Sequence, residues 1–563
     1  MHQQADSKQA TDSARTVPEK PSALAPFSNP VFRSLWMATL ISNLGGLVQA
    51  VAAGWTMTTL TDSEHMVALV TASTTLPIMA LSLISGVLAD NYDRRRIMMV
   101  AQSLMLVVSV GLTLAMFFGI LTPWSLLVFT FLIGCGTALN NPSWQASVGD
   151  IVPREQVPAA VMANGMSFNL MRSVGPALGG LIIVAAGATA AFSLNAVSYL
   201  AMILALALWK RPQIERALPR ERFGQAAAAG IRYVGLSPNL LRIILRGFLF
   251  GVTGVSVLAL LPLVARDLLE GSASTYGFLL GLFGLGAVAG AFNNARIRAA
   301  FDNETIVRTT FAGMALGVLL LSVAPNMLVA ALALLICGAC WVTTNALLNV
   351  SLQLSTPRWV VGRALSFYMT ANAGGMAAGS WIWGMIAEQN SLQSALLFSA
   401  GTLILGSLIG YRLPLPEFDR LNLDPLNKFI EPTLAVQLTQ RTGPIMVTVD
   451  FDIADQDIPA FLDAMSARRR VRLRDGARRW SLLRDLENPN IWTEKYYVAT
   501  WVEYIRHNQR RTVTDAGVSE RLHALHQGDK PPLVRRMIER QTLPKPIETP
   551  AKGFEEPRYQ APH

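Results

Sequence analysis

Long apolar stretches separated by short polar turns dominate the chain up to about residue 413. Each stretch has the roughly 20 residues that a helix needs to cross a bilayer. The twelve stretches are 35–60, 66–88, 97–120, 123–145, 159–186, 188–209, 241–265, 275–297, 305–324, 327–350, 362–387 and 391–412. The pattern predicts an all-α membrane protein, because a helix in lipid satisfies its own backbone hydrogen bonds.

The second six stretches repeat features of the first six at a constant separation of 204 positions. The pairs related in this way include Gly86 with Gly290, Asn141 with Asn345, and Asp90 with Asn294. The repeat predicts two parallel six-helix halves with a central site between them. In the last pair, Asp90 of the first half corresponds to Asn294 of the second half, so only the first half has an acid at this position.

Polar and Pro-rich segments divide the rest of the chain. We expect a disordered tail at 1–30, a six-helix half at 31–210, a cytoplasmic linker at 211–240, a second half at 241–413, a linker at 414–442, a cytoplasmic α+β domain at 443–540 and a disordered tail at 541–563. Alternating residues at 445–451 predict a strand, 455–472 a helix, 480–483 and 496–501 strands, and 504–526 a helix. This order suggests a ferredoxin-like domain.

Composition agrees with a membrane protein, since 52% of residues are hydrophobic and only 15% are charged. The net charge of +10 lies mostly in alternate loops and in the C-terminal region, so it indicates membrane orientation and no nucleic-acid partner. The Arg-rich loops predict that both termini are cytoplasmic. The bilayer is the expected surrounding, and the bacterial inner (plasma) membrane the expected location.

Cysteine and histidine patterns give no reason to expect a metal or a cofactor. Cys337 and Cys340 form a C-x-x-C pair inside an apolar stretch without a second pair, which favours packing over zinc. No Walker loop is present, so ATP is not expected to drive the protein directly.

The charged segment from Gly86 to Arg96 joins the second and third stretches. Asp90 ends one stretch, and Arg94 and Arg95 begin the next. Such a charge pair at a helix junction would contribute about 1 kcal/mol, enough to bias two states. We expect Gly86, Asp90, Arg94 and Arg95 to act as a gate. The alternative is a loop whose arginines only fix orientation.

The fifth stretch carries a charge near the middle of the membrane, Arg172. A charge there is costly unless it faces protein or water, which makes Arg172 a candidate for substrate contact. A structural arginine capped by carbonyls is the alternative. Gly175, Pro176, Gly179 and Gly180 follow it and are expected to permit close helix packing.

Polar residues within the stretches are candidates for the lining of a cavity. Polar side chains in spans usually face the bundle interior, although some only join helices by hydrogen bonds. The candidates are Ser42, Asn43, Gln49, Asn141, Gln145, Asn169, Arg172, Asn345 and Asn349. No stretch has a titratable acid near its middle, so the coupling ion stays open, with the proton as a candidate.

The C-terminal region has a cluster of arginines on its first predicted helix, at 468, 469, 470, 472 and 474. A solvated helix end is one interpretation, and contact with anionic lipid headgroups is the other.

Several of these features together resemble the major facilitator superfamily. The segment Gly86–Arg96 is similar to that family's loop signature between its second and third helices, and Gly175–Gly180 to the fifth-helix signature of its exporters. A glycine four positions before Gly175 is replaced by Met171. Residues Asn29–Arg33, with Asn29-Pro30 and Phe32, extend the resemblance to the enterobactin-exporter-like branch, called transmembrane secretion effectors. The C-terminal domain is similar to antibiotic-biosynthesis monooxygenases.

The resemblance implies a twelve-helix secondary transporter that exports a small siderophore- or drug-like molecule by alternating access, as an antiporter or otherwise. An importer on the same fold is the first alternative. A membrane-anchored monooxygenase-like enzyme is the second, although twelve spans far exceed what anchoring needs. The C-terminal domain would then serve regulation or dimerisation.

Overall fold

The computed structural model describes most of the chain. The described residues are 24–153, 156–209, 223–357, 359–415, 423, 426, 429, 431–436, 438–439, 441–528 and 530–538, without the side chains of 83, 87, 89–91, 158, 169, 223 and 225–227. The far parts of both tails expected to be disordered therefore lie outside the described residues. Residues Ala25–Ser28, within the expected N-terminal tail, form a short 3-10 helix.

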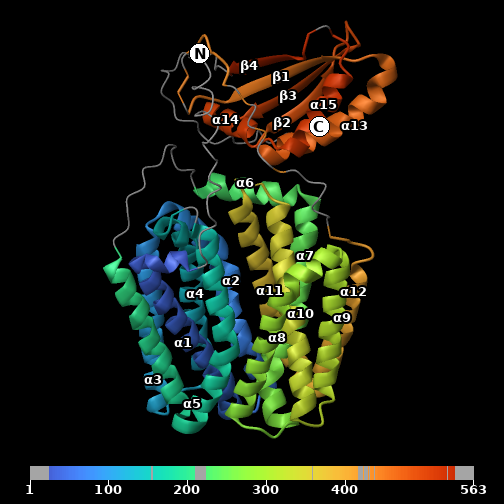
Figure 1. The fold of residues 1–563 in the computed structure, drawn as a ribbon. Helices are drawn as coiled ribbons and strands as arrows, with labels where there is room; N and C mark the ends of the chain where they lie inside the picture. The colour runs from blue at the N-terminus through green and yellow to red at the C-terminus, as the bar shows by residue number, and fades with distance from the viewer. Residues whose placement is uncertain are drawn as a thin grey trace, which may run out of the picture.

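Long helices fill the region between residues 30 and 409 (Figure 1). The first half contains α1 (Pro30–Leu60), α2 (Glu64–Asn91), α3 (Arg94–Phe117), α4 (Pro123–Ile151) and α5 (Val157–Leu208). The second contains α7 (Pro238–Leu263), α8 (Ala273–Ala300), α9 (Asn303–Ser322), α10 (Met327–Leu354), α11 (Val361–Gln389) and α12 (Leu392–Ile409). A π-helical turn, Val264–Leu268, follows α7.

Ten helices among the described residues are long and apolar enough to cross a membrane. The chain is thus a multi-pass membrane protein. Two of the predicted stretches, 159–186 and 188–209, correspond to one element of the structure, α5, which is 52 residues long. Gly187 interrupts that helix with φ of 81°, a left-handed conformation that glycine adopts without steric cost. The chain therefore turns at Gly187.

Short polar side chains set where several helices begin. Asn29 accepts hydrogen bonds from the backbone N–H groups of Val31 and Phe32, and Pro30 occupies the first helical position. Asn29 also donates through Nδ2 to the carbonyl oxygen of Ile151, at 2.8 Å. This residue consequently caps α1 and holds its start against the end of α4.

Helices α5 and α8 pack backbone against backbone, and they belong to different halves. A Cβ added at Gly277 would lie 2.5 Å from the carbonyl oxygen of Pro176, and one at Gly284 would lie 2.5 Å from that of Arg172. Gly180 is equally close to α8, because its Cβ would lie 2.6 Å from the oxygen of Ala273. Small residues permit this approach, as in other membrane helix pairs.

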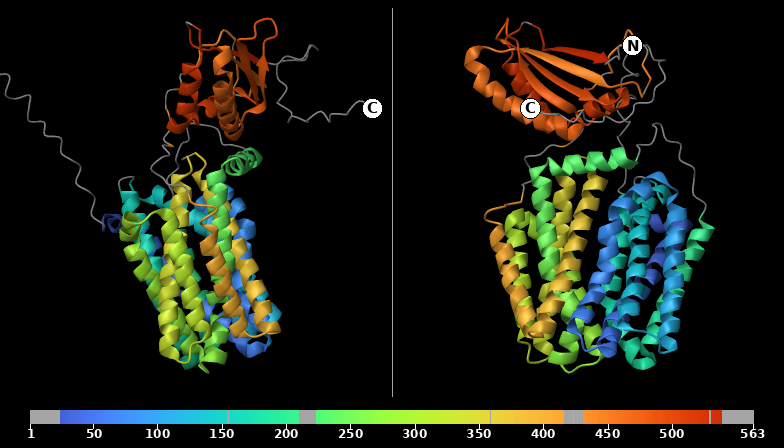
Figure 2. Two further views of the ribbon diagram at one scale, coloured as in Figure 1. Left: turned by 90° about the vertical axis from the view of Figure 1, so that its right-hand side faces the viewer. Right: turned by 180° about the vertical axis from the view of Figure 1, so that it is seen from behind.

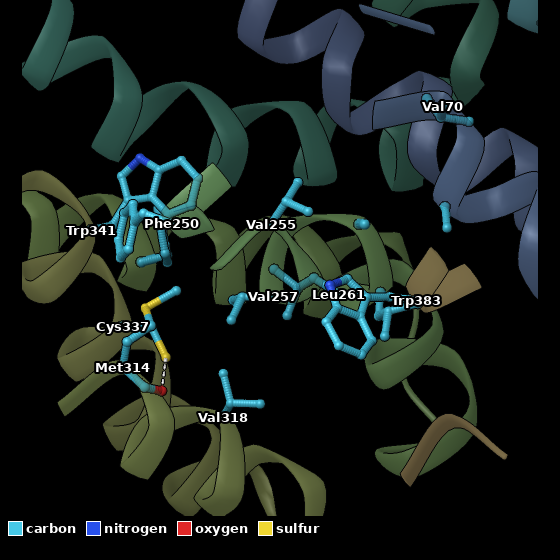
Figure 3. Close-up of a cluster of buried hydrophobic side chains, with 14 of the residues drawn as sticks. Val70, Phe250, Val255, Val257, Leu261, Met314, Val318, Cys337, Trp341 and Trp383 are labelled. Carbon is cyan, nitrogen blue, oxygen red and sulfur yellow. Dashed lines mark hydrogen bonds between the residues drawn. The ribbon is translucent and has the colours of Figure 1, made fainter. Parts of the chain in front are cut away.

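Aromatic and sulfur side chains fill the interior of the second half (Figure 3). The rings of Phe250 and Trp341 lie 5.2 Å apart between α7 and α10. Cys337 is fully buried beside Met314, whose carbonyl oxygen lies 3.9 Å from the cysteine sulfur. The environment of Cys337 is that of a packing residue.

A short helix, α6 (Phe223–Gly235), lies across the end of the bundle, within the segment that joins the halves. The C-terminal domain stands over the same end (Figures 1 and 2). Its elements are β1 (Ile445–Asp452), α13 (Ile458–Asp475), β2 (Arg478–Arg484), β3 (Ile491–Val498), α14 (Trp501–Gln509), α15 (Val513–Ala524) and β4 (Leu533–Ile538). The antiparallel sheet has the order β2-β3-β1-β4.

Three details of this domain differ from the pattern expected from its sequence. Strand β4 was not expected. The third strand was expected to begin at residue 496, but β3 starts at Ile491. One helix was also expected at 504–526, whereas α14 ends at Gln509. A second helix, α15, begins after Thr512, which caps it through a reciprocal pair of hydrogen bonds with Asp515. The T-x-x-D spacing was the signal for that second start.

A buried ion pair network joins α13 to the sheet. Glu494 of β3 has no exposed side-chain surface and accepts from Nε of Arg468 at 2.8 Å and from Nε of Arg472 at 3.2 Å. Burial alone would raise the pKa of Glu494, but the charges of Arg472 and Arg468 bring it down to about 2. The two expectations for the arginine cluster, solvent and lipid headgroups, are therefore wrong for Arg468 and Arg472.

We expect Gly277→Ala to destabilise the protein by about 1–3 kcal/mol, because its Cβ would collide with the backbone of α5. Heating the detergent-purified protein and following loss of the monodisperse peak would show a lower melting temperature. Gly401→Ala in α12 is the matched control, since its Cβ would meet no atom within 4 Å. Equal melting temperatures for both variants would contradict backbone contact between α5 and α8.

We expect Glu494→Gln to open the C-terminal domain, because two buried guanidinium groups lose their carboxylate at a cost of about 3–5 kcal/mol. Limited proteolysis of the full chain would show faster cleavage within 443–538. The wild-type domain should lose this contribution as pH falls from the model-compound pKa of 4.5 towards 2, since the folded-state pKa is the lower one. Exposed Glu487→Gln is the control, and cleavage as slow as in that variant would contradict the prediction.

Candidate functional site

The predicted gate lies at the junction of α2 and α3, at the end of the bundle beneath α6 (Figure 1). Asp93 caps α3 by accepting from the backbone N–H of Arg95 at 3.0 Å. Gly86 faces the other half, because a Cβ there would lie 3.2 Å from Oγ of Ser366 in α11. Asp90 lies in the last turn of α2. Its side chain is outside the described set.

Arg94 and Arg95 bind the ends of two neighbouring helices. Nη1 of Arg94 donates to the carbonyl oxygen of Ala146 at 2.7 Å and to Oδ2 of Asp150 at 3.0 Å, both in α4. Arg95 donates to the carbonyl oxygens of Leu206 at 2.7 Å and Ala207 at 2.9 Å, at the end of α5. Carbonyl groups at a helix C-terminus lack partners and carry partial negative charge, so they attract cations.

Asp150 is the partner that sequence reasoning missed. The side chains of Arg94 and Asp150 are 14% and 10% exposed, so the ion pair is largely shielded from solvent. An acid in the last turn of a helix is unfavourable unless a cation offsets the helix dipole. The position of Asp150 in the last turn of the fourth stretch was therefore the available signal.

A second set of polar contacts joins the two halves at the opposite end. Glu388 at the end of α11 accepts from Oγ of Ser63 at 2.7 Å and from the backbone N–H of His65 at 3.0 Å. Nearby, Nη1 of Arg266 donates to the carbonyl oxygen of Thr58 in α1, at 3.0 Å. These contacts hold the halves together at the end remote from the C-terminal domain.

Arg172 lies on α5 where that helix contacts α8. Its guanidinium carbon is 5.4 Å from the ring centre of Phe283, and the side chain is partly exposed. A guanidinium over an aromatic face is stabilised by the ring quadrupole. The side chain of Asn169, one turn earlier, is outside the described set. Arg172 is thus a charge at the contact between the halves.

The packing residues that follow Arg172 face two helices. Gly175 and Gly179 approach α1, because their Cβ atoms would lie 2.9 Å from Leu47 and 3.1 Å from Val48. Pro176 and Gly180 approach α8, as described above. One face of α5 therefore contacts its own half and another face contacts the opposite half.

The remaining cavity candidates occupy different surroundings. Gln49 is buried and accepts hydrogen bonds from Ser109 and Asn195, which places it in a polar cluster inside the first half. Asn345 donates to the carbonyl oxygen of Trp341. Asn349 accepts from Gln353. Asn141 and Gln145 are exposed on α4, and Ser42 and Asn43 are half-buried on α1.

A buried ion pair in the second half was also missed. Arg246 of α7 is 1% exposed and donates to Oε1 of Glu304 at 2.6 Å and to the carbonyl oxygen of Gly406 at 2.7 Å. Glu304 also accepts from the backbone N–H of Leu415. The pair joins α7, α9 and the segment after α12, so its geometry is structural.

A small cavity lies between α13, α14 and α15 of the C-terminal domain. Its lining includes Arg468, Arg472 and His507, and its volume is about 10 Å³. A bound water needs about that volume, so this cavity has no room for an organic substrate.

Comparison with known proteins identifies relatives for most of the chain. Residues 21–542 match the family described as transmembrane secretion effector. Enterobactin exporter EntS of Escherichia coli O1:K1 / APEC is 26% identical over 407 residues, which cover 71% of this chain and 95% of that protein. EntS of Shigella boydii serotype 4 (strain Sb227) gives the same identity and coverage.

Solved transporter structures share the fold at low sequence identity. A bacterial homolog to the human lysosomal transporter Spinster, in an inward-facing and occupied conformation, has a TM-score of 0.55 and 13% identity, covering 69% of this chain and 97% of that one. A POT family transporter in complex with 5-aminolevulinic acid has a TM-score of 0.57 and 12% identity, covering 68% and 95%. Since the family match spans nearly the whole chain, the protein belongs to the transmembrane secretion effectors of the major facilitator superfamily.

Proposed function

We propose that the protein is a secondary active exporter of a small siderophore- or drug-like organic molecule across the bacterial inner membrane. Its family and relatives are transporters, so the chain is a membrane transporter and not an enzyme. The observation that carries the export direction is the similarity to enterobactin exporters over 95% of their length. An importer on the same fold is the competing proposal.

The topology that we propose has twelve spans in two six-helix halves. The break at Gly187 divides α5 into two spans, and α11, with 29 residues, supplies another beside the remaining long helices. Both termini would then be cytoplasmic, on the side of the Arg-rich loops. The C-terminal domain would be a cytoplasmic ferredoxin-like unit, which its sheet order supports. Dimerisation through that domain also stays a proposal.

The mechanism that we propose is alternating access between two tilted arrangements of the halves. Glu388 and Arg266 join the halves at the outer end, and close packing of α5 with α8 continues from there to Arg172. Opening at that end would break these contacts, while Arg94 and Arg95 keep the inner ends of α3, α4 and α5 together as one unit. A proton gradient would drive the cycle.

Arg172 is the residue that we propose meets the substrate. It is a cation at the contact of the halves, so an anionic or metal-chelating group on the substrate would complement it. The binding of the substrate would then be coupled to the separation of α5 from α8. The polar candidates on α4 and α10 would contribute hydrogen bonds from the two sides.

We expect Arg172→Ala to reduce efflux at least about tenfold, because a hydrogen bond from a charged group to the substrate contributes about 1.5–3 kcal/mol. Enterobactin would be the probe, and its export would be measured in a strain that lacks its own exporter. Arg172→Lys keeps the charge and should retain part of the rate. Full efflux by a properly folded Arg172→Ala protein would remove Arg172 from the proposal.

Direction and coupling need a separate measurement with the same probe. Inverted vesicles with an imposed proton gradient should accumulate enterobactin if the protein exports it. Uptake only into right-side-out vesicles would favour the importer. Accumulation that does not depend on the gradient would exclude the proton as the coupling ion.

We expect Arg94→Ala and Asp150→Asn each to slow efflux severalfold, and the double variant to be no slower than either. The two residues form one shielded ion pair, and contacting residues typically couple by about 0.5–3 kcal/mol. Arg96→Ala is the control, because its side chain is 89% exposed. Additive effects of the two changes would show that Arg94 and Asp150 do not act together. The variant Asp90→Asn tests, in the same assay, the acid that the sequence pattern predicts for the gate.

A further inference from the structure

A cavity of about 150 Å³ lies between α6 and the C-terminal domain. It is called the α6 cavity here. One bound water needs about 10–15 Å³, so this space admits a much larger group. Small residues of α6, including Gly224 and Ala228, form one wall, and the ends of α13, β2 and α14 form the other. The α6 cavity therefore joins the linker of the two halves to the appended domain.

The charges around the α6 cavity are unbalanced. The lining contains four guanidinium groups and two carboxylates, from Arg232, Arg478, Arg506, Arg510, Asp475 and Glu503. Asp475 is already paired outside the cavity, since its Oδ1 accepts from Nε of Arg474 at 2.9 Å. Glu503 is the other carboxylate of the lining, and Arg506 and Arg510 also have partners of their own. An added anion would reduce the repulsion between Arg232 and Arg478.

Among the residues that line the α6 cavity, Arg232 gives the clearest indication that a hydrogen-bond acceptor is missing. It projects from α6 across to the domain, because a Cβ added at Gly476 would lie 3.3 Å from its Nη2. Its Nε is buried and has no hydrogen-bond partner among the described residues. Burial and the nearby charge of Arg478 lower the pKa of Arg232. A buried donor without an acceptor is costly, so an acceptor in the cavity would be favoured.

The surroundings hold both walls in place without the ligand. The guanidinium of Arg474 lies 5.0 Å from the ring centre of Tyr233 in α6, and that ring meets Trp359 edge to face at 5.4 Å. Arg510 stacks on the other side of this group, with its guanidinium carbon 4.0 Å from the Trp359 ring centre. Arg510 is therefore positioned beforehand, which lowers the entropic cost of binding.

We propose that the α6 cavity binds a small phosphate-bearing anion and thereby fastens the C-terminal domain to the helix that links the two halves. Phosphate suits clustered guanidinium groups, because each planar fork can donate two parallel hydrogen bonds to its oxygens. The phosphate could belong to a soluble compound or to an anionic lipid headgroup, since α6 lies across the end of the bundle (Figure 1). The α6 cavity lies between α6 and the C-terminal domain, and the inference does not rest on the transported substrate.

The test is thermal unfolding of the purified full-length protein in a neutral detergent. One arm adds about 10 mM inorganic pyrophosphate at an ionic strength matched with chloride, and the other adds phosphatidylglycerol against phosphatidylcholine in mixed micelles. A ligand at a hundred times its Kd stabilises the folded state enough to raise the melting temperature by about 3 °C or more. Stabilisation by pyrophosphate indicates a soluble ligand, and stabilisation by phosphatidylglycerol alone indicates a headgroup.

Two variants assign any shift to the α6 cavity. Arg478→Gln should abolish it, and because Arg478 is exposed, its replacement does not threaten folding. Arg470→Gln, an exposed arginine of α13 outside the cavity, should keep the full shift. The proposal is overturned if neither arm stabilises the protein beyond its control, or if Arg478→Gln shifts as much as Arg470→Gln.

Discussion

Close contact between the backbones of α5 and α8 is the constraint on which the arrangement of the halves depends. Gly277 and Gly284 of α8 face carbonyl oxygens of α5 at distances that leave no space for a side chain. In lipid there is little hydrophobic gain from bringing two apolar helices together, so shape and close packing decide which helices pair. The glycines of this contact can also separate without leaving side-chain polar groups unpaired. The same surface can therefore hold the halves together and allow them to part.

The charged groups of the membrane region lie mainly at helix ends, where they join helices without crossing lipid. Arg94 donates to a carbonyl oxygen in the last two turns of α4, and Arg95 donates to one at the end of α5. Asp150 and Glu304 form ion pairs with nearby arginines. Each of these pairs lies within one half. Within each half they favour a rigid unit, whereas the contacts of Glu388 and Gly86 cross between the halves. Motion is then directed to the boundary between the halves.

The C-terminal domain uses its arginines differently from a lipid-binding surface. Arg468 and Arg472 form ion pairs with Glu494 inside the domain. Arg474 forms ion pairs with Asp475 and Asp515. Burying such charges costs free energy, and it is tolerated here because the hydrogen bonds of the carboxylate are satisfied.

Hydrophobic periodicity alone determined that this is a membrane protein with long helices, because only a run of about 20 apolar residues satisfies the bilayer. It also placed the break between two stretches at residue 187, where glycine acts locally. It began the first helix at residue 35, whereas Asn29 caps α1 so that the helix begins at Pro30. Local patterns placed three of the four strands of the C-terminal sheet, although β4 has no alternation that distinguishes it from a basic tail.

Only the tertiary structure decided which charges meet. The sequence placed Asp90 near Arg94, and that pairing stays a prediction because the Asp90 side chain is outside the described set. The structure adds Asp150, which is 56 positions away, as a partner of the same arginine. Gln49 looked like a pore residue, yet helices α3 and α5 supply its partners. The α6 cavity likewise forms from segments almost 250 positions apart. Periodicity reports the face of a helix that is buried, but the identity of the neighbour on that face depends on how the helices pack.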